Sequence, residues 1–254
     1  MNIFDSHAHY LSEAFDEDRE QLLTRLLATD VDGIIEAGTT AADSQKAVAL
    51  AENFPRMWAT VGVHPSETAD AKDEDLAVLQ SLVTHKKVVA IGEIGLDYHY
   101  EEDNPREKQQ VWFRRQLALA KECGLPVVIH DREAHEDVLN LLKDYRPAGV
   151  VHCFSGSAEM AKEILKLGMY IGIGGVVTFK NARKLVEVAE QLPLDRLLLE
   201  TDAPYLAPGP LRGHRCDSSM ITHTAAVIAS LRGMTTQEII DIAADNTRRL
   251  YNLS

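Results

Sequence analysis

Val88-Val89-Ala90-Ile91-Gly92-Glu93 is the stretch from which the fold of this 254-residue chain is most readily inferred, because it is apolar up to the glutamate that ends it. Side chains of a strand alternate between two faces, so a run without polar residues predicts a strand covered on both faces, as in a parallel sheet. Seven other apolar runs resemble it. We predict strands at 2–7, 31–37, 57–63, 88–94, 126–131, 149–153, 170–174 and 197–201.

Segments with helical character fill the intervals between these runs. Asn104, which is followed by a proline, predicts the start of the clearest helix with asparagine as its cap, and Gly124 predicts its end. Ser157 and Asn181 each precede a further helical segment. Strand and helix therefore alternate along the chain, which is the pattern of an α/β protein.

The length of the chain narrows the choice among α/β folds. A single (β/α)8 barrel typically has about 250 residues, and 45% hydrophobic residues suffice for a sizeable core. An open doubly wound sheet is expected to carry a phosphate-binding loop at its first turn, and none is present there. The glycine cluster at 172–175 is better explained as a crowded strand end. We predict one domain, residues 1–254, folded as a single (β/α)8 TIM barrel.

Composition restricts the partners and the compartment. The formal net charge of −13 argues against an extended basic groove for nucleic acid, although it leaves room for a local site. The three cysteines show no C-x-x-C pairing, which favours a reducing compartment. The first residues show neither the basic region nor the apolar region of a secretory leader, so we expect none, and no apolar run approaches the roughly 20 residues that span a bilayer. We therefore predict a soluble, cytoplasmic protein without a membrane partner.

Metal-ligand residue types stand at or just past the ends of five of the predicted strands. His7 and His9 are two residues apart, so their imidazoles can point to the same face of a strand and reach one ion. The carboxyl ends of the strands of a barrel meet at one mouth, which would bring the ligands together. Imidazole and carboxylate suit zinc, manganese, cobalt or magnesium, and six ligands suit two ions that share a carboxylate. The candidates are His7, His9, Glu93, His130, His152 and Asp202.

Several motifs in order give the chain a family resemblance over nearly its whole length. They are Asp5-Ser6-His7-Ala8-His9, Val61-Gly62-Val63-His64-Pro65, Gly92-Glu93-Ile94-Gly95-Leu96-Asp97-Tyr98, Pro126-Val127-Val128-Ile129-His130, His152-Cys153-Phe154-Ser155-Gly156 and Glu200-Thr201-Asp202-Ala203-Pro204-Tyr205-Leu206. With these motifs the sequence resembles the TatD family of metal-dependent deoxyribonucleases, which are amidohydrolase-like barrels.

The resemblance implies a set of roles. His7, His9, Glu93 and Asp202 would surround one metal, Glu93, His130 and His152 would hold the second, and Glu93 would bridge the two. Asp202 would accept the proton of the attacking water, so Asp202 and Glu93 are the candidate catalytic residues. The implied reaction is hydrolysis of DNA phosphodiesters from the 3′ end, with a preference for single strands.

The resemblance is incomplete in one loop. After Arg212 the chain continues Gly213-His214-Arg215-Cys216-Asp217-Ser218, without the Asn-Glu-Pro-like triplet common in the family, which puts substrate preference in doubt. Each candidate substrate-binding residue also has a simpler explanation. Lys180 and Arg212 would be solvated surface charges, His64 would be a hydrogen-bonded residue at the end of a strand, and Phe154 would be a buried side chain. The candidate substrate-binding residues are His64, Phe154, Lys180 and Arg212.

Two other functions are compatible with the same residues. A metal-activated water can also cleave an ester or amide, such as the aminoacyl ester of a D-aminoacyl-tRNA, so charged tRNA is the alternative partner. The altered loop could instead mark a protein that binds metal and phosphate without turnover. The sequence leaves open the metal, the use of RNA as a substrate and the oligomeric state.

Overall fold

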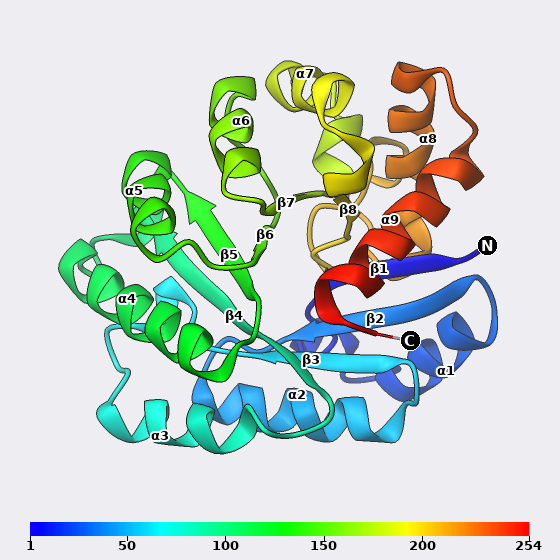
Figure 1. Ribbon diagram of the computed structural model, residues 1–254. Coiled ribbons are helices and arrows are strands. Elements are labelled where there is room, and N and C mark those ends of the chain that lie inside the picture. The colour runs from blue at the N-terminus through cyan, green and yellow to red at the C-terminus, as the bar shows by residue number, and fades with distance from the viewer. Residues whose placement is uncertain (254) are drawn as a thin grey trace. The chain divides into compact units, whose positions relative to one another are not determined.

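The computed structural model describes residues 1–253, and Ser254 lies outside the described residues. Over this part of the chain, strands alternate with helices (Figure 1). The strands are β1 (Ile3–Ala8), β2 (Val31–Ala37), β3 (Met57–Val61), β4 (Val88–Asp97), β5 (Val127–Arg132), β6 (Gly149–Val151), β7 (Tyr170–Ile173) and β8 (Leu197–Leu199). The α-helices are α1 (Arg19–Ala28), α2 (Ala41–Asn53), α3 (Asp73–Leu82), α4 (Arg106–Cys123), α5 (His135–Tyr145), α6 (Ala158–Lys166), α7 (Arg183–Gln191), α8 (Ile221–Arg232) and α9 (Thr236–Tyr251).

The strands form one sheet in which they follow their order in the chain, from β1 to β8. The pairs β1–β2, β3–β4, β4–β5, β5–β6 and β7–β8 are all parallel. Eight parallel strands in chain order, each followed by a helical segment, are the arrangement of a (β/α)8 barrel. The predicted fold class is confirmed. No helix within residues 1–253 combines the length and the apolar character needed to cross a membrane.

All eight predicted strands are present, but several of their ends differ from the prediction. Strand β4 continues three residues further than expected, to Asp97, whereas β6 and β8 each end two residues earlier. The predicted cap of α4 is wrong: the helix begins at Arg106, and the Asn104 side chain instead accepts a hydrogen bond from the backbone N–H of Ala69 at 2.9 Å. The start predicted after Ser157 is confirmed, because its hydroxyl accepts from the N–H of Met160 at 3.3 Å.

The chain divides into two compact units. The first unit comprises Met1–Glu36, Cys153–Lys162 and Tyr170–Ser254, and the second unit comprises Ala37–His152 and Glu163–Met169. Strands β1, β7 and β8 belong to the first unit, as does β2 except for its last residue, Ala37, and β3 to β6 belong to the second. That residues 1–254 act as one domain stays a prediction.

In the first unit, α9 packs along β1 and β8 (Figure 1). The buried side chain of Asn246 on α9 donates hydrogen bonds to the carbonyl oxygens of Leu194 and Leu197, at 2.7 and 2.8 Å, and so fixes the beginning of β8. At the carboxyl ends of these two strands, Ala8 forms a parallel β-bridge with Ala203, which follows β8. The ends of β1 and β8 therefore lie side by side, with the residues that follow them close together.

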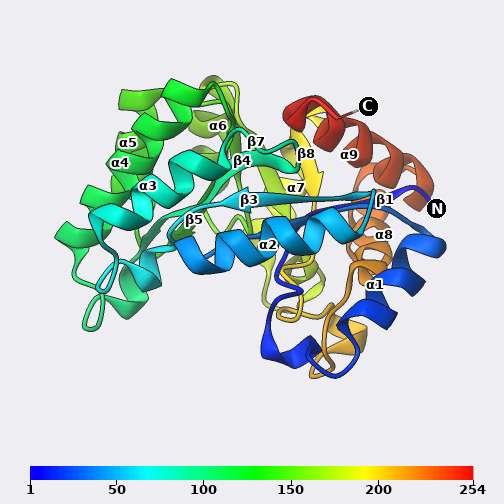
Figure 2. The ribbon, with the colours of Figure 1, turned by 90° about the horizontal axis from the view of Figure 1, so that it is seen from below.

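In the second unit, α2 runs along β3 (Figure 2), and α4 packs on β4. Two buried glutamines of α4 form hydrogen bonds with the backbone, one just after the end of β3 and one at the last residue of β4. Gln116 accepts from the N–H of Val63 at 2.7 Å and donates to its carbonyl oxygen at 3.0 Å. Gln109 makes the same pair of bonds with the backbone of Asp97, both at 2.8 Å. These amides explain the long β4, because they give its last residue the backbone partners of a strand.

Gly95 provides a test of how tightly β4 and β5 are packed. Its φ is +148°, and a methyl group there would lie 2.0 Å from the carbonyl oxygen of His130. Gly95→Ala is expected to lower the free energy of unfolding by about 3 kcal/mol, because both the conformation and the space exclude a side chain. Urea unfolding followed by circular dichroism measures this loss.

Gly124 is the matched control, because it also has a positive φ, of +67°, but has no atom within 4 Å of the added methyl group. Gly124→Ala is expected to cost about 1 kcal/mol, from backbone strain alone. Equal losses for the two variants would show that close packing against β5 is not the reason for glycine at position 95.

Candidate metal centre

The first unit brings together three of the predicted ligands at the ends of β1 and β8. The Nε2 atoms of His7 and His9 lie 3.1 Å apart. Asp202 Oδ1 lies 3.6 Å from Nε2 of His7 and 3.3 Å from Nε2 of His9. One donor atom from each of the three residues lies within 4.8 Å of the other two, so the three atoms could bind a single ion.

The backbone holds these three residues in place. Asp202 has a positive φ of 61°, and its N–H donates to the carbonyl oxygen of His7 at 3.0 Å. The N–H of His9 in turn donates to the carbonyl oxygen of Ala203 at 2.7 Å. The spacing between the histidines and the aspartate is therefore set by main-chain hydrogen bonds, and not by the side chains alone.

Asp5 is a buried positioning residue beneath this group. Its carboxylate accepts from the backbone N–H groups of His7 and Thr201, at 3.3 and 3.0 Å, and from the hydroxyls of Thr201 and Ser218, at 2.6 and 2.7 Å. Burial raises the pKa of the Asp5 carboxyl to about 6, in spite of these hydrogen bonds, which lower it. Asp5 thus joins β1 to the segment after β8. The sequence placed it in a motif without a role.

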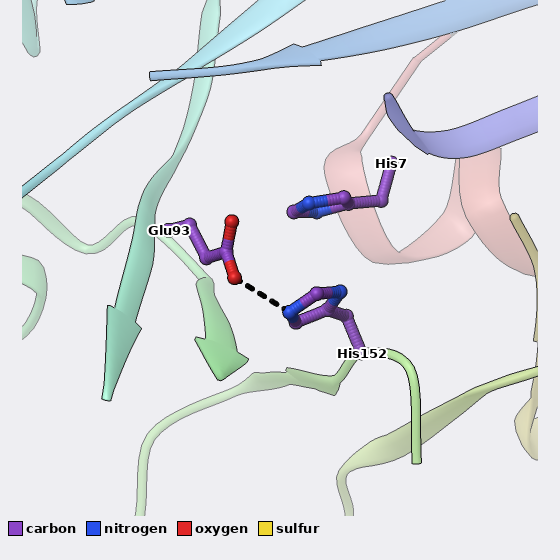
Figure 3. A group of neighbouring side chains, drawn as sticks. All are labelled: His7, Glu93 and His152. Atoms are coloured by element: carbon purple, nitrogen blue, oxygen red, sulfur yellow. Dashed lines mark ion pairs between the residues drawn. The ribbon is translucent and has the colours of Figure 1, made fainter. Parts of the chain in front are cut away.

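In the second unit the group is built around one oxygen of Glu93, on β4. Glu93 Oε1 lies 2.7 Å from Nδ1 of His130, 2.7 Å from Nε2 of His152 and 3.3 Å from Nε2 of His64. Figure 3 shows the Glu93 carboxylate directed at the His152 imidazole, with their ion pair dashed. Glu93 and His152 are both buried. A single carboxylate therefore receives imidazoles that come from the ends of three strands.

Asp97 orients one of these imidazoles. Its Oδ2 lies 2.9 Å from Nε2 of His130, so the ring stands between two carboxylates with Nδ1 facing Glu93. Burial lowers the pKa of His130, but the two carboxylates raise it more, to about 9. For Asp97, burial raises the pKa and His130 lowers it, and the net direction is down. Asp97 also accepts from the N–H of His99 at 3.1 Å, so it both orients the His130 imidazole and caps the loop.

His64 belongs with the donors more closely than the sequence indicated. It precedes a short 3-10 helix, Pro65–Glu67, and its Nδ1 accepts from the N–H of Ser66 at 3.1 Å. That contact turns Nε2 towards Glu93, and the ligand atoms of His64, Glu93 and His130 lie within 4.8 Å of one another. We predicted a substrate contact for His64, and the structure places it beside the carboxylate that the other imidazoles share.

The two donor groups fit divalent metal ions. Both offer imidazole nitrogens and carboxylate oxygens, the ligands expected of zinc and manganese, from residues that are buried or half-buried. Buried carboxylates and imidazoles packed this closely are stabilised when a cation is shared among them.

The other predicted substrate residues differ in exposure. Phe154 is only 2% exposed and cannot present a face to a base, so the burial alternative is the one that describes it. Lys180 and Arg212 are exposed, in the segments after β7 and β8, and the guanidinium of Arg212 lies 4.7 Å from the centre of the Phe179 ring. Arg215 is tied to Asp18 by two hydrogen bonds, at 2.8 and 2.7 Å, which accounts for its charge.

Comparison with known proteins identifies the family. A family model described as TatD related DNase matches residues 4–252. The chain belongs to this family. Among its relatives, a metal-dependent hydrolase of Bacillus subtilis, YabD, is 44% identical over 255 residues, covering 99% of this chain and all of the relative. A protein of Erwinia tasmaniensis named 3′-5′ ssDNA/RNA exonuclease TatD is 38% identical over 260 residues, again covering 99% of this chain and all of the relative.

A solved structure supports the assignment to the TatD family. The TatD homologue YjjV of Escherichia coli superposes with a TM-score of 0.92 at 36% identity, over 99% of this chain and 98% of the other. The family resemblance and the barrel fold inferred from the sequence are thus confirmed. So is the class of enzyme, a metal-dependent hydrolase.

Proposed function

We propose that the protein is a two-metal nuclease that shortens single-stranded DNA from its 3′ end. One ion would be held by His7, His9 and Asp202, the other by His130 and His152, and Glu93 would be the shared ligand. The proposal rests on the position of Glu93. One oxygen of its carboxylate lies within 3.3 Å of nitrogen atoms of three imidazoles, whereas a simple ion pair needs only one. A carboxylate shared between two ions is the usual core of such centres.

The residues of the site have distinct roles in this proposal. Bound divalent ions supply Lewis acidity, which stabilises charge on a phosphoryl oxygen and lowers the pKa of an attacking water. Asp202 accepts the proton of that water, because its carboxylate is partly exposed while its backbone is fixed to His7. Asp97 keeps the His130 ring turned towards Glu93, and Asp5 keeps His7 in register with the segment after β8.

The choice of nucleic acid as the substrate has two supports. The relative from Erwinia tasmaniensis, and another from Klebsiella pneumoniae, are named as exonucleases of single-stranded DNA and RNA. Lys180 and Arg212 add two exposed cations in the loops that follow β7 and β8, where barrels commonly bind phosphate. RNA is therefore included as a second substrate of the same site.

We also propose that residues 1–254 act as one domain in the cytoplasm. One family model matches residues 4–252, which supports the single domain. Among the described residues, Cys123, Cys153 and Cys216 form no disulfide bond, which suits a reducing compartment.

Metal removal is the direct test of the proposal. Metal-loaded protein is incubated with 5′-labelled single-stranded DNA, duplex DNA and RNA, with and without EDTA. We expect a ladder of successively shorter labelled products from the single strands, its loss in EDTA, and its return when manganese or zinc is added back. Removal from the 5′ end would instead release the label at once as a mononucleotide.

Two results would contradict the proposal. Cleavage that persists in EDTA would exclude a metal-dependent site. Failure of the metal-loaded protein to cut any of the three nucleic acids would favour the alternative, an ester hydrolase. Release of D-amino acid from D-aminoacyl-tRNA is the assay for that activity.

A further inference from the structure

Two large apolar side chains are exposed directly beyond Asp202. Tyr205 is 57% exposed and Leu206 is 37% exposed, whereas Ala203 and Ala207 on either side of them are buried. More than half of the surface of this tyrosine is exposed beside a group of imidazole and carboxylate side chains, and two adjacent exposed apolar side chains form a surface on which an apolar part of a ligand can pack.

The backbone under these two side chains is fixed. The N–H of Tyr205 donates to the carbonyl oxygen of Asp202 at 2.9 Å, and the N–H of Cys216 donates to that of Pro204 at 3.0 Å. A methyl group at Gly175, which begins the 3-10 helix Gly175–Thr178 after β7, would lie 2.3 Å from the carbonyl oxygen of Leu206. The segment is thus pressed against the loop after β7, so the ring is exposed on a rigid support.

The ring also lies at the edge of the donor group of the first unit. Its centre is 6.4 Å from that of the His9 imidazole, in an edge-to-face arrangement. The loops after β7 and β8 are joined by a hydrogen bond from the N–H of Gly209 to the hydroxyl of Thr178 at 2.6 Å, and each loop carries an exposed cation. One of these cations, Arg212, follows Gly209 in the loop after β8, and its guanidinium lies over the Phe179 ring.

We propose that Tyr205 is the platform on which the nucleobase next to the bound phosphate stacks, with Leu206 extending its apolar surface. This inference rests on the proposed nuclease function. Every base has an aromatic face, so stacking on a tyrosine holds a strand without reading its sequence. Tyrosine loses little side-chain entropy when it is buried by a ligand, and its fixed backbone reduces that cost further.

The proposal explains a preference for single strands. A base in a duplex is already stacked on both sides by its neighbours, so it must be unstacked before Tyr205 can contact it, whereas a base at a single-stranded end is free. It also assigns the aromatic contact to a different residue from the one predicted from the sequence, since Phe154 is buried.

The test measures binding, so that it does not depend on turnover. All proteins carry Asp202→Asn to prevent cleavage, are loaded with manganese, and are titrated into a 5′-fluorescent single-stranded oligonucleotide while anisotropy is recorded. A second oligonucleotide lacks the bases of its last two 3′ nucleotides. Tyr205→Ala is expected to raise the Kd of the complete oligonucleotide about 10-fold and to leave the two oligonucleotides bound equally, because the stacking partner is gone.

Two control variants define the contribution of the ring. Tyr205→Phe keeps the aromatic face and is expected to retain the preference for the complete oligonucleotide. Val111→Ala removes an exposed apolar side chain from α4, in the second unit, and is expected to leave both Kd values unchanged. Because Tyr205 is largely exposed, its removal is not expected to unfold the protein, which thermal denaturation checks.

The outcomes separate the two proposals. If Tyr205→Ala binds both oligonucleotides as tightly as the parent, the stacking role is wrong, and the nuclease function stands as long as the protein with Asp202 intact cleaves DNA. If that intact protein neither cleaves nor binds DNA, the proposed function itself is wrong and the stacking role is overturned with it.

Discussion

Replacing Asp202 by asparagine is expected to lower kcat for single-stranded DNA about 10³-fold, because the carboxylate that accepts the proton of water is lost while its shape is kept. His7 and His9 remain in place, since main-chain bonds fix this part of the first unit. At least one metal ion is therefore expected to stay bound. Single-turnover cleavage of a labelled strand gives the rate, and elemental analysis of the dialysed protein gives the metal content.

The matched control for this prediction is Asp195→Asn, which removes an exposed carboxylate elsewhere in the first unit. Its partner Arg196 lies 3.6 Å away at the surface, and surface ion pairs of this kind contribute little to the stability of the fold. Activity equal to that of the parent is expected for this control. If Asp202→Asn were equally active, the carboxylate at that position would not be the proton acceptor.

Replacing Glu93 by alanine is expected to have the larger effect on metal content. The variant should bind one ion or none, and its activity should fall by more than about 10³-fold, because the shared ligand and the electrostatic stabilisation that depends on it are both removed. His130 and His152 would also lose the carboxylate oxygen that lies 2.7 Å from each. Elemental analysis and the same cleavage assay measure both effects.

Glu107→Ala provides the comparison for Glu93→Ala, because Glu107 is exposed in the first turn of α4 and is not one of the proposed metal ligands. It is expected to retain the metal content and the activity of the parent. Two ions retained in Glu93→Ala would rule out a bridging carboxylate at this position. A circular dichroism spectrum of each variant distinguishes the loss of metal from the loss of the fold.

The positions of the strands could be predicted from the sequence because they depend on local composition. Runs such as Val127-Val128-Ile129 are β-branched and apolar on both faces, and only a strand inside a parallel sheet buries them completely. The donor residues followed from this, since a ligand at the carboxyl end of such a run must lie at the same edge of the sheet as the others of its unit.

The features that the sequence did not predict depend on contacts between distant residues. Strand β4 reaches Asp97 because Gln109, from the next helix, pairs with its backbone. Asn104 does not cap α4 because its side chain is bonded to Ala69, 35 positions earlier in the chain. Nothing near either residue in the sequence indicates these partners, and the burial of Phe154 is likewise a property of the packed loop.

The two buried glutamines of α4 place a constraint on the length of that helix. Gln109 and Gln116 are seven residues apart, close to two full turns, so both amides reach the strand ends from one face. One residue inserted between them would rotate Gln116 by about 100° relative to Gln109 and release either Val63, which precedes His64, or Asp97, which orients His130. The turns of α4 between Gln109 and Gln116 therefore set the spacing of the backbone beside His64 and His130, because both amides must reach their partners at the same time.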